Sequence, residues 1–268
     1  MLHALKLEWL KYKKDPVFLT LLILYTVMFP TMILFGKTLK ETPPPLPTPN
    51  SAYEFPFIWD VLGYAGNWLL FFFFGFLSVY VVTSDYTFRT LRQNIISGMS
   101  RFRYFLGKLS FLWLLSILAT IYYFIWVLIY GYTHTPTEFT FNEVMEWDMI
   151  LRFALMAFGY TSFGLFIGFL VRRMALSMFL FYVYTLFIEP VFRWAVHFKI
   201  FEHKSMQYYP MNAIEDLAPV PFKEIADEFT TETGMQFFLD PSAAILIAGI
   251  YTILFVLGGY WLLQRRDL

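Results

Sequence analysis

Residues 69–74 of the chain read LLFFFF, and they lie within a longer run, 58–83, whose one charged side chain is Asp60 near its start. A helix needs ~20 mostly apolar residues to cross the ~30 Å hydrocarbon core of a bilayer. The run exceeds that length and is apolar throughout its middle. It therefore predicts a membrane-spanning helix.

Five further runs have the same character, at about residues 16–35, 106–131, 150–171, 176–192 and 241–263. A soluble core of this size could not bury six such helices. We therefore expect an all-α integral membrane protein with six transmembrane helices in a single domain, residues 1–268. The first span is expected to be retained as an anchor, because it is longer than the apolar part of a signal peptide and no small-residue cleavage site follows it.

The composition points the same way. The chain is 58% apolar, 22% aromatic and 15% charged, whereas soluble domains are about 45–50% apolar and about 25% charged. Its 20 basic and 20 acidic side chains cancel, which excludes a generally basic nucleic-acid binder. The absence of cysteine from the sequence excludes disulfides, thiolate nucleophiles and cysteine-bound metals.

The distribution of Lys and Arg predicts the orientation. If both termini are cytoplasmic, the inner segments carry 13 Lys and Arg and the outer segments carry 7. Loops rich in Lys and Arg stay on the cytoplasmic side. The counts therefore predict an N-in, C-in topology, with net charges of +9 inside and −9 outside. We expect a multi-pass membrane protein with both termini in the cytoplasm.

Charged residues are confined to the ends of the predicted spans. Lys108 and Arg152 fall in first turns, from which long side chains can snorkel to the interface. Glu189 lies in the outer part of the fifth span, four residues before Arg193, with Pro190 between them. It could form a local ion pair with Arg193, or it could handle substrate or protons. Span centres without carboxylates disfavour an ion-coupled carrier, so we expect energy to come from another subunit.

The sequence shows no catalytic constellation, and no catalytic, cofactor-binding or metal-binding residue is predicted. Its four histidines are scattered, and it contains neither H-E-x-x-H nor G-x-S-x-G. The chain itself is therefore not expected to be an enzyme. Gly164 and Gly168 form a small-xxx-small pattern, which predicts close helix packing within the subunit or in a dimer.

Residues 1–15 predict a helix that lies at the membrane interface before the first span. The apolar stripe Leu2, Leu5, Trp9 and Tyr12 would face the bilayer. Trp9 would lie at headgroup depth, and basic residues that include Lys13 and Lys14 would face anionic lipid. A simple helical lead-in to the span remains the alternative.

Residues 84–105 form the cytoplasmic segment between the second and third spans. Thr87 is a suitable N-cap for a short helix over 88–97, and Gly98 is a suitable stop. Phe88, Leu91 and Ile95 would share one face of that helix. Such a helix could transmit force from a docked protein, and the geometry is equally compatible with a membrane-surface helix.

The motif RTLRQN at residues 89–94, followed by Gly98, Ser100, Arg101 and Lys108, resembles the signature of ABC-2 type transporter permeases. It looks most like the branch common in Bacteroidetes. Many members carry Gly-Thr where this chain has Arg-Thr, with an acidic residue before it, a place that Asp85 could take. The segment LKLEWLK at 5–11 resembles the elbow helix of that family, and YPMNAIEDL at 209–217 is also similar.

The resemblance implies a half-transporter. Two six-span subunits, as a homodimer or heterodimer, would form the conduit with two separate ABC ATPase subunits that bind ATP and Mg²⁺. Short outer helices would lie within 193–240, and the stripe Phe222, Ile225 and Phe229 supports one of them. The residues expected to couple to the ATPase are Phe88, Arg89, Thr90, Leu91, Arg92, Gln93, Asn94, Gly98, Ser100 and Arg101.

Two functions follow from this resemblance. The first is a permease of an ATP-driven exporter that moves an amphipathic or lipid-like compound outward. The second is a non-transporting membrane subunit that transmits ATPase force to a protein machine in the periplasm. A membrane-embedded hydrolase is disfavoured, because no polar catalytic pair occurs within the spans.

Overall fold

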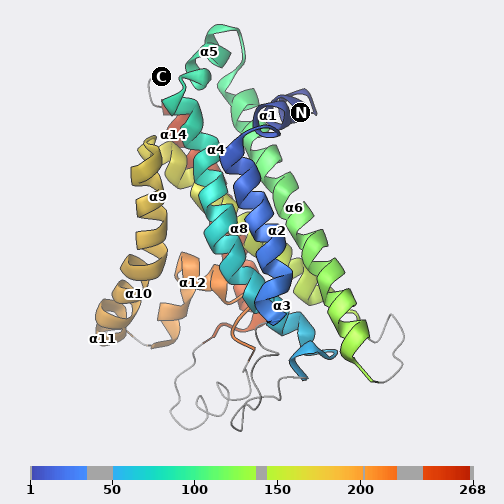
Figure 1. Cartoon of the computed structure of the whole chain (residues 1–268). Helices are drawn as coiled ribbons and strands as arrows, with labels where there is room; N and C mark the ends of the chain where they lie inside the picture. Colours follow the sequence, from blue (N-terminus) through green and yellow to red (C-terminus); the bar gives the residue numbers. More distant parts are fainter. Residues whose placement is uncertain (1, 35–50, 137–143, 202, 222–237, 266–268) are drawn as a thin grey trace.

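A computed structural model describes residues 2–34, 51–136, 144–201, 203–221 and 238–265, and every regular element in these ranges is helical. The long helices lie side by side in one bundle (Figure 1). Both chain termini lie at the same end of the bundle, together with the short helix α5, Thr90–Ile96. This end is named the α5 end, and the opposite one the α12 end after α12, Pro210–Glu215.

Five helical stretches are long and apolar enough to cross a membrane: Ile58–Thr87, Arg101–His134, Trp147–Val171, Met174–Ile200 and Pro241–Arg265. A sixth candidate arises if α1 and α2 are taken together, since the pair passes the same test with an 89° bend. These helices are α1, Leu2–Tyr12, and α2, Pro16–Leu34. The described part of the chain therefore holds five or six candidate spans.

The second span contains α3, Ile58–Leu69, and α4, Gly75–Thr87, joined by a π-helical turn, Leu70–Phe74. This turn is the phenylalanine block with which the sequence analysis began. Phe71 and Phe74 are buried in the core, whereas Phe72 is exposed on the outside of the bundle. Residues three apart share one face of a helix, so the block is divided between the core and the outside of the bundle.

The fifth span runs further than predicted. It begins as α9, Met174–Val183, and continues to Ile200 rather than ending near residue 192. Two π-helical stretches, Tyr184–Ile188 and Phe192–His197, lie on either side of Pro190. Proline has no N–H for the helical ladder, and wider turns around it let the helix continue.

Gly164 and Gly168 lie on α8, Trp147–Val171, where it packs against α4. A Cβ atom at Gly164 would overlap Ser78 Oγ, and one at Gly168 would lie 2.8 Å from Val82 Cβ. The close approach of these two glycines is therefore made inside the subunit.

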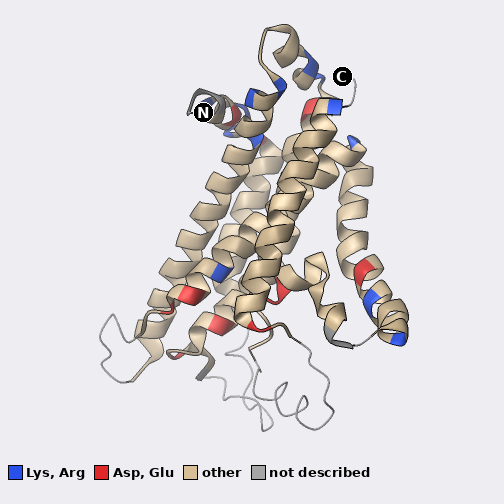
Figure 2. Ribbon diagram, turned by 180° about the vertical axis from the view of Figure 1, so that it is seen from behind, with Lys and Arg blue, Asp and Glu red and all other residues tan. Residues whose placement is uncertain are grey.

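The third and sixth spans complete the bundle as α6, Arg101–His134, and α14, Pro241–Arg265. Lys and Arg are concentrated at the α5 end and acids at the α12 end (Figure 2). The predicted outer stripe at Phe222, Ile225 and Phe229 lies outside the described residues.

Candidate coupling site at the α5 end

Helix α5 lies beyond the ends of the long helices and connects α4 with α6 (Figure 1). It is shorter than the predicted helix, and Thr87 does not cap it. Thr87 is the last residue of α4, and its hydroxyl donates to Thr83 O at 3.1 Å. The chain turns at Arg89 instead, which has a left-handed φ of 57°.

The end of α5 agrees with the prediction. Gly98 has a φ of +96°, a left-handed conformation that glycine adopts without steric cost. Ser100 precedes α6, and its hydroxyl accepts a hydrogen bond from Arg103 N at 3.3 Å. Local capping chemistry therefore defines where α5 stops and α6 starts.

Helix α5 has one buried and one exposed side. Leu91 is buried and Ile95 packs partly against the core. The prediction that Phe88 shares their face is wrong, because Phe88 precedes the helix and is 65% exposed. Ile96 is 75% exposed. The exposed side also carries Arg89, Arg92 and Gln93.

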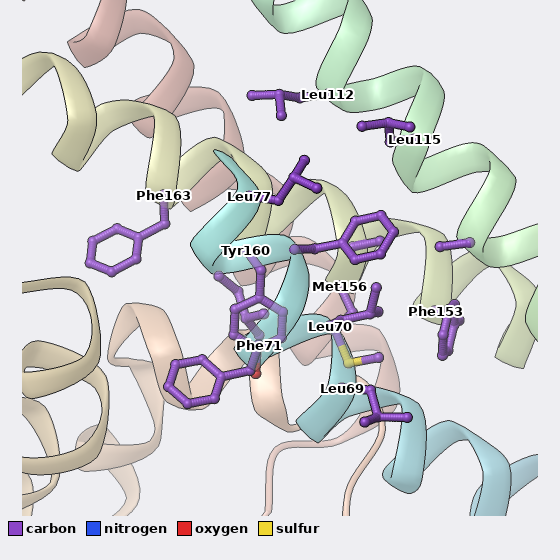
Figure 3. Close-up of a cluster of buried hydrophobic side chains, with 14 of the residues drawn as sticks. Leu69, Leu70, Phe71, Leu77, Leu112, Leu115, Phe153, Met156, Tyr160 and Phe163 are labelled. Carbon is purple, nitrogen blue, oxygen red and sulfur yellow. The ribbon is translucent and has the colours of Figure 1, made fainter. Parts of the chain in front are cut away.

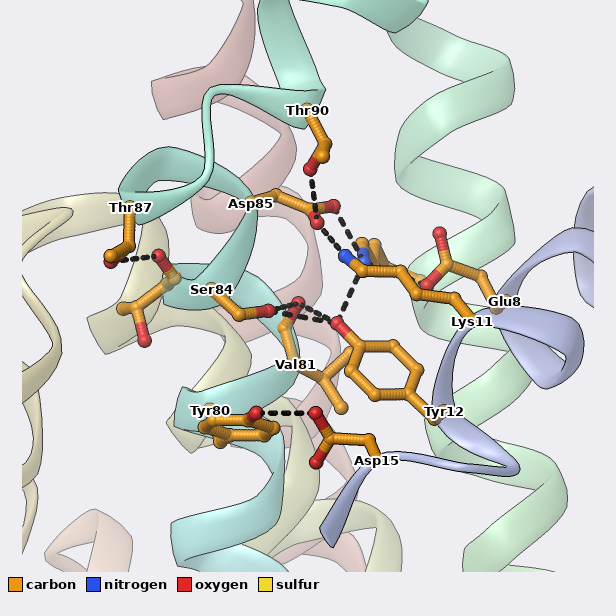
Figure 4. Close-up of polar contacts among 12 residues, drawn as sticks. Glu8, Lys11, Tyr12, Asp15, Tyr80, Val81, Ser84, Asp85, Thr87 and Thr90 are labelled. Carbon is orange, nitrogen blue, oxygen red and sulfur yellow. Dashed lines mark hydrogen bonds and ion pairs between the residues drawn. The ribbon is translucent and has the colours of Figure 1, made fainter. Parts of the chain in front are cut away.

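Asp85, near the end of α4, is hydrogen-bonded across the turn between α4 and α5. Its carboxylate accepts hydrogen bonds at 2.7 Å from Thr90 Oγ1 in α5 and from Tyr104 OH in α6. It also pairs with Lys108 Nζ at 2.7 Å and with Lys11 of α1. Figure 4 shows Asp85 with its partners Thr90 and Lys11 around it. One carboxylate thus connects α1, α4, α5 and α6.

The α1 helix is joined to the bundle through the same cluster. Lys108 Nζ pairs with Glu8 Oε2 at 2.7 Å. Tyr12 OH donates to Val81 O at 2.9 Å, and burial raises the pKa of the Tyr12 phenol, which keeps it a neutral donor. Helix α1 is therefore anchored to the rest of the bundle through these contacts.

Two predictions about this region are wrong. Lys108 does not snorkel: its exposed fraction is 0%, and it sits between the carboxylates of Glu8 and Asp85. The α1 stripe does not face one way either, since Tyr12 is buried while Trp9 is 47% exposed. Glu8 of α1 and Asp85 of α4 supply the counter-charges of Lys108. The sequence of the third span alone does not predict these partners.

Lys13 and Lys14 are exposed, so they remain available to lipid headgroups. Arg101 is engaged within the chain, because its guanidinium donates to Leu263 O at 3.0 Å, near the end of α14. Asn94 borders a cavity of about 220 Å³ that also includes Met99 and Arg103. This cavity lies between α1, α5 and α6.

The cluster brings two lysines, Lys11 and Lys108, against two carboxylates, Glu8 and Asp85, and Lys108 and Asp85 are almost wholly buried. Burial and the neighbouring Lys108 lower the pKa of Lys11 to about 7. Removing one partner of a buried ion pair leaves an uncompensated charge and costs about 3–5 kcal/mol. The four groups therefore link α1, α4 and α6 at this end.

At the α12 end, Glu189 and Arg193 do not form the predicted ion pair. Glu189 accepts hydrogen bonds from the backbone N–H groups of Met211 and Asn212, at 3.1 and 2.8 Å. The Arg193 guanidinium donates to Met206 O at 2.9 Å. Because the intervening helix is partly π-helical, positions four apart no longer lie one above the other.

The helical bundle, with five or six candidate spans and a short helix outside it, defines a multi-pass membrane protein. Residues 4–188 match the family model described as ABC-2 family transporter protein, and the chain belongs to that family. Membership makes it a permease subunit of an ABC transporter and implies association with an ABC ATPase subunit. No curated protein matches the sequence significantly. The Bacteroidetes branch stays a prediction.

Proposed function

We propose that the chain is the membrane subunit of an ATP-driven exporter and that α5 receives force from the ATPase. The observation that carries the proposal is the position of α5. It lies outside the bundle, exposes Arg89, Arg92 and Gln93, and is bonded through Thr90 to Asp85. A protein that binds this exposed surface therefore has a short hydrogen-bonded path to the buried cluster.

The cluster explains how a push on α5 would reach the spans. Leu91 fills a buried position, so α5 cannot slide over the bundle without displacing core side chains. Movement of Thr90 either breaks its bond to Asp85 or carries α4 along. Asp85 in turn holds Lys108 of α6, and Lys108 holds Glu8 of α1. Dense packing transmits such displacements rather than absorbing them.

In this proposal the α5 end faces the cytoplasm of a bacterial inner membrane. The concentration of Lys and Arg at that end supports the orientation (Figure 2). Two partner ATPase subunits bind ATP and Mg²⁺. Two copies of the permease, or this chain and a related one, form the translocation path. The exported compound is amphipathic or lipid-like.

The test is to purify the tagged full-length chain from its native membrane and to measure recovery of an ABC ATPase subunit with it. Arg89→Glu and Arg92→Glu should each abolish ATPase recovery, because they reverse the charge of the exposed face. Arg173→Glu is the matched control, since Arg173 is exposed in the separate α8–α9 turn. Unchanged recovery with both α5 variants would overturn the coupling role. Stimulation of the ATPase by an amphipathic compound would distinguish export from a purely mechanical role.

A further inference from the structure

A second cavity lies at the α12 end, away from the coupling site. It measures about 160 Å³ and is bounded by α3, α8 and α12. Its walls include the rings of Tyr64, Trp68, Phe71 and Tyr160. The rings of Phe71 and Tyr160 lie side by side with centroids 5.7 Å apart (Figure 3). Five of the twelve lining residues, these four and Phe238, are therefore aromatic.

Most of the polar groups in the wall are already engaged. Tyr160 OH donates to Asn67 Oδ1 at 2.6 Å. Of the two carboxylates in the lining, Asp216 accepts bonds from Asn212 Nδ2 at 2.9 Å and from Leu239 N at 3.0 Å. These hydrogen bonds hold the lining side chains in position. They also occupy part of the hydrogen-bonding capacity of those side chains.

Glu215, the other carboxylate, differs from Asp216. It lines the cavity and is half-buried, and its side chain has no hydrogen-bond or ion-pair partner among the residues that the structure describes. A desolvated carboxylate without a partner is unfavourable unless it is protonated or a ligand compensates it. When Glu215 is ionised, the cavity presents a negative charge beside aromatic side chains.

These features select the chemical class of ligand. Ring faces attract organic cations, and quaternary ammonium groups are the usual guests of aromatic cages. A cavity of about 150 Å³ holds a molecule of the size of benzene, and the present one is similar at about 160 Å³. Anions are repelled by the carboxylates. The described residues form no group of three or more potential metal ligands.

We propose that this cavity binds the cationic head, a tertiary or quaternary ammonium, of an amphipathic compound, with Glu215 as its counter-ion. That the compound is the exported cargo rests on the proposed function; the binding itself does not. Trp68 is exposed at the edge of the cavity, next to the exposed ring of Phe72. The apolar part of the ligand can therefore extend toward the lipid.

The surrounding charges agree with this assignment. Burial and the carboxylates of Glu189 and Asp216 raise the pKa of Glu215 to about 7, while Arg193 acts in the opposite direction. Three carboxylates thus face one guanidinium in this region. A bound cation would favour the ionised form of Glu215, so binding should weaken as the pH falls below about 7.

The test measures binding of radiolabelled benzyltrimethylammonium to the purified full-length chain, without ATPase, in a detergent with an uncharged head. We expect saturable binding at pH 8, and none for the anion benzenesulfonate. Glu215→Gln should weaken binding by about tenfold or more. The matched control Asp240→Asn, which alters an exposed acid at the same end, should stay within about twofold.

A second variant guards against misfolding. Trp68→Leu keeps every carboxylate and should weaken binding by about threefold or more, because one ring face is lost. Absence of saturable binding, or equal affinity of the wild type and a folded Glu215→Gln, would overturn the proposal. If binding persists while the α5 charge reversals leave ATPase recovery unchanged, the proposed coupling fails and the site stands. If the ATPase docks as expected but the cation does not bind, only this inference fails.

Discussion

Thr90 Oγ1 donates a hydrogen bond of 2.7 Å to Asp85 Oδ1, which joins the first turn of α5 to the end of α4. The bond is charge-assisted, and hydrogen bonds to charged groups contribute about 1.5–3 kcal/mol. Asp85 also pairs with Lys108 at 2.7 Å. The helix proposed to receive force and the helices proposed to move therefore share one buried carboxylate.

Thr90→Val should separate docking from transmission. The exposed arginines of α5 are unchanged, so recovery of the ATPase should stay the same. Transport per ATP hydrolysed should fall several-fold, because the bond to Asp85 is lost. Thr90→Ser retains the hydroxyl and should behave like the wild type. Equal transport by the valine and serine variants would show that this bond carries no coupling.

Lys108→Met should destabilise the fold by about 3–5 kcal/mol, because Glu8 and Asp85 are left without their buried counter-ion. Thermal unfolding in detergent measures the loss. Adding Glu8→Gln should recover part of it, since one uncompensated charge disappears. Lys14→Met, at an exposed position of the same region, should change stability by less than about 0.5 kcal/mol. A Lys108→Met protein as stable as the wild type would contradict the cluster.

Gly164→Ala tests the contact between α4 and α8. Its Cβ would overlap Ser78 Oγ, and overpacking of this kind costs about 1–3 kcal/mol. Gly249→Ala is the matched control, because no atom lies within 4 Å of a Cβ placed there. Adding Ser78→Ala to Gly164→Ala should restore part of the stability. Similar unfolding temperatures for the two alanine variants would place the α4–α8 contact elsewhere.

The spans were predictable because each is a contiguous apolar run, and continuous helices are the form such runs take in lipid. Gly98 and Ser100 were predictable because capping depends on residues a few positions apart. Lys108 and Glu8 are 100 residues apart, so no local pattern announces their contact. Thr87 does not cap α5 because it is still part of α4. The helix of the second span extends past the point at which the N-cap preference of threonine predicts a new helix.

The same reasoning explains the α12 end. The spacing of Glu189 and Arg193 predicts an ion pair only in a regular α-helix, and Pro190 replaces that geometry with π-helical turns. The unpartnered carboxylate of Glu215 depends on how α12 lies against α3 and α8. The adjacent acids Glu215 and Asp216 in the sequence therefore give no indication of a cavity.

Stability against pH provides the last prediction, and it concerns Glu215. Burial raises the pKa of this carboxyl from 4.5 to about 7 in the folded chain. Between these values the folded state binds more protons than the unfolded state, so stability falls as the pH rises from about 4.5 to about 7. Burial raises the pKa of Asp216 to about 7 as well, and it contributes in the same direction.

Glu215→Gln should therefore unfold at the same temperature as the wild type near pH 4 and at a higher temperature at pH 8. The expected gain at pH 8 is about 1–3 kcal/mol, because glutamine removes a charge that the ligand-free fold leaves uncompensated. Benzyltrimethylammonium should stabilise the wild type at pH 8 and have little effect on the variant, since a ligand of the folded state raises its stability by mass action. A variant less stable than the wild type at pH 8 would mean that Glu215 already has a counter-ion in the fold. The carboxylate of Glu215 would then need no cationic ligand, and the argument for an ammonium ligand would fail.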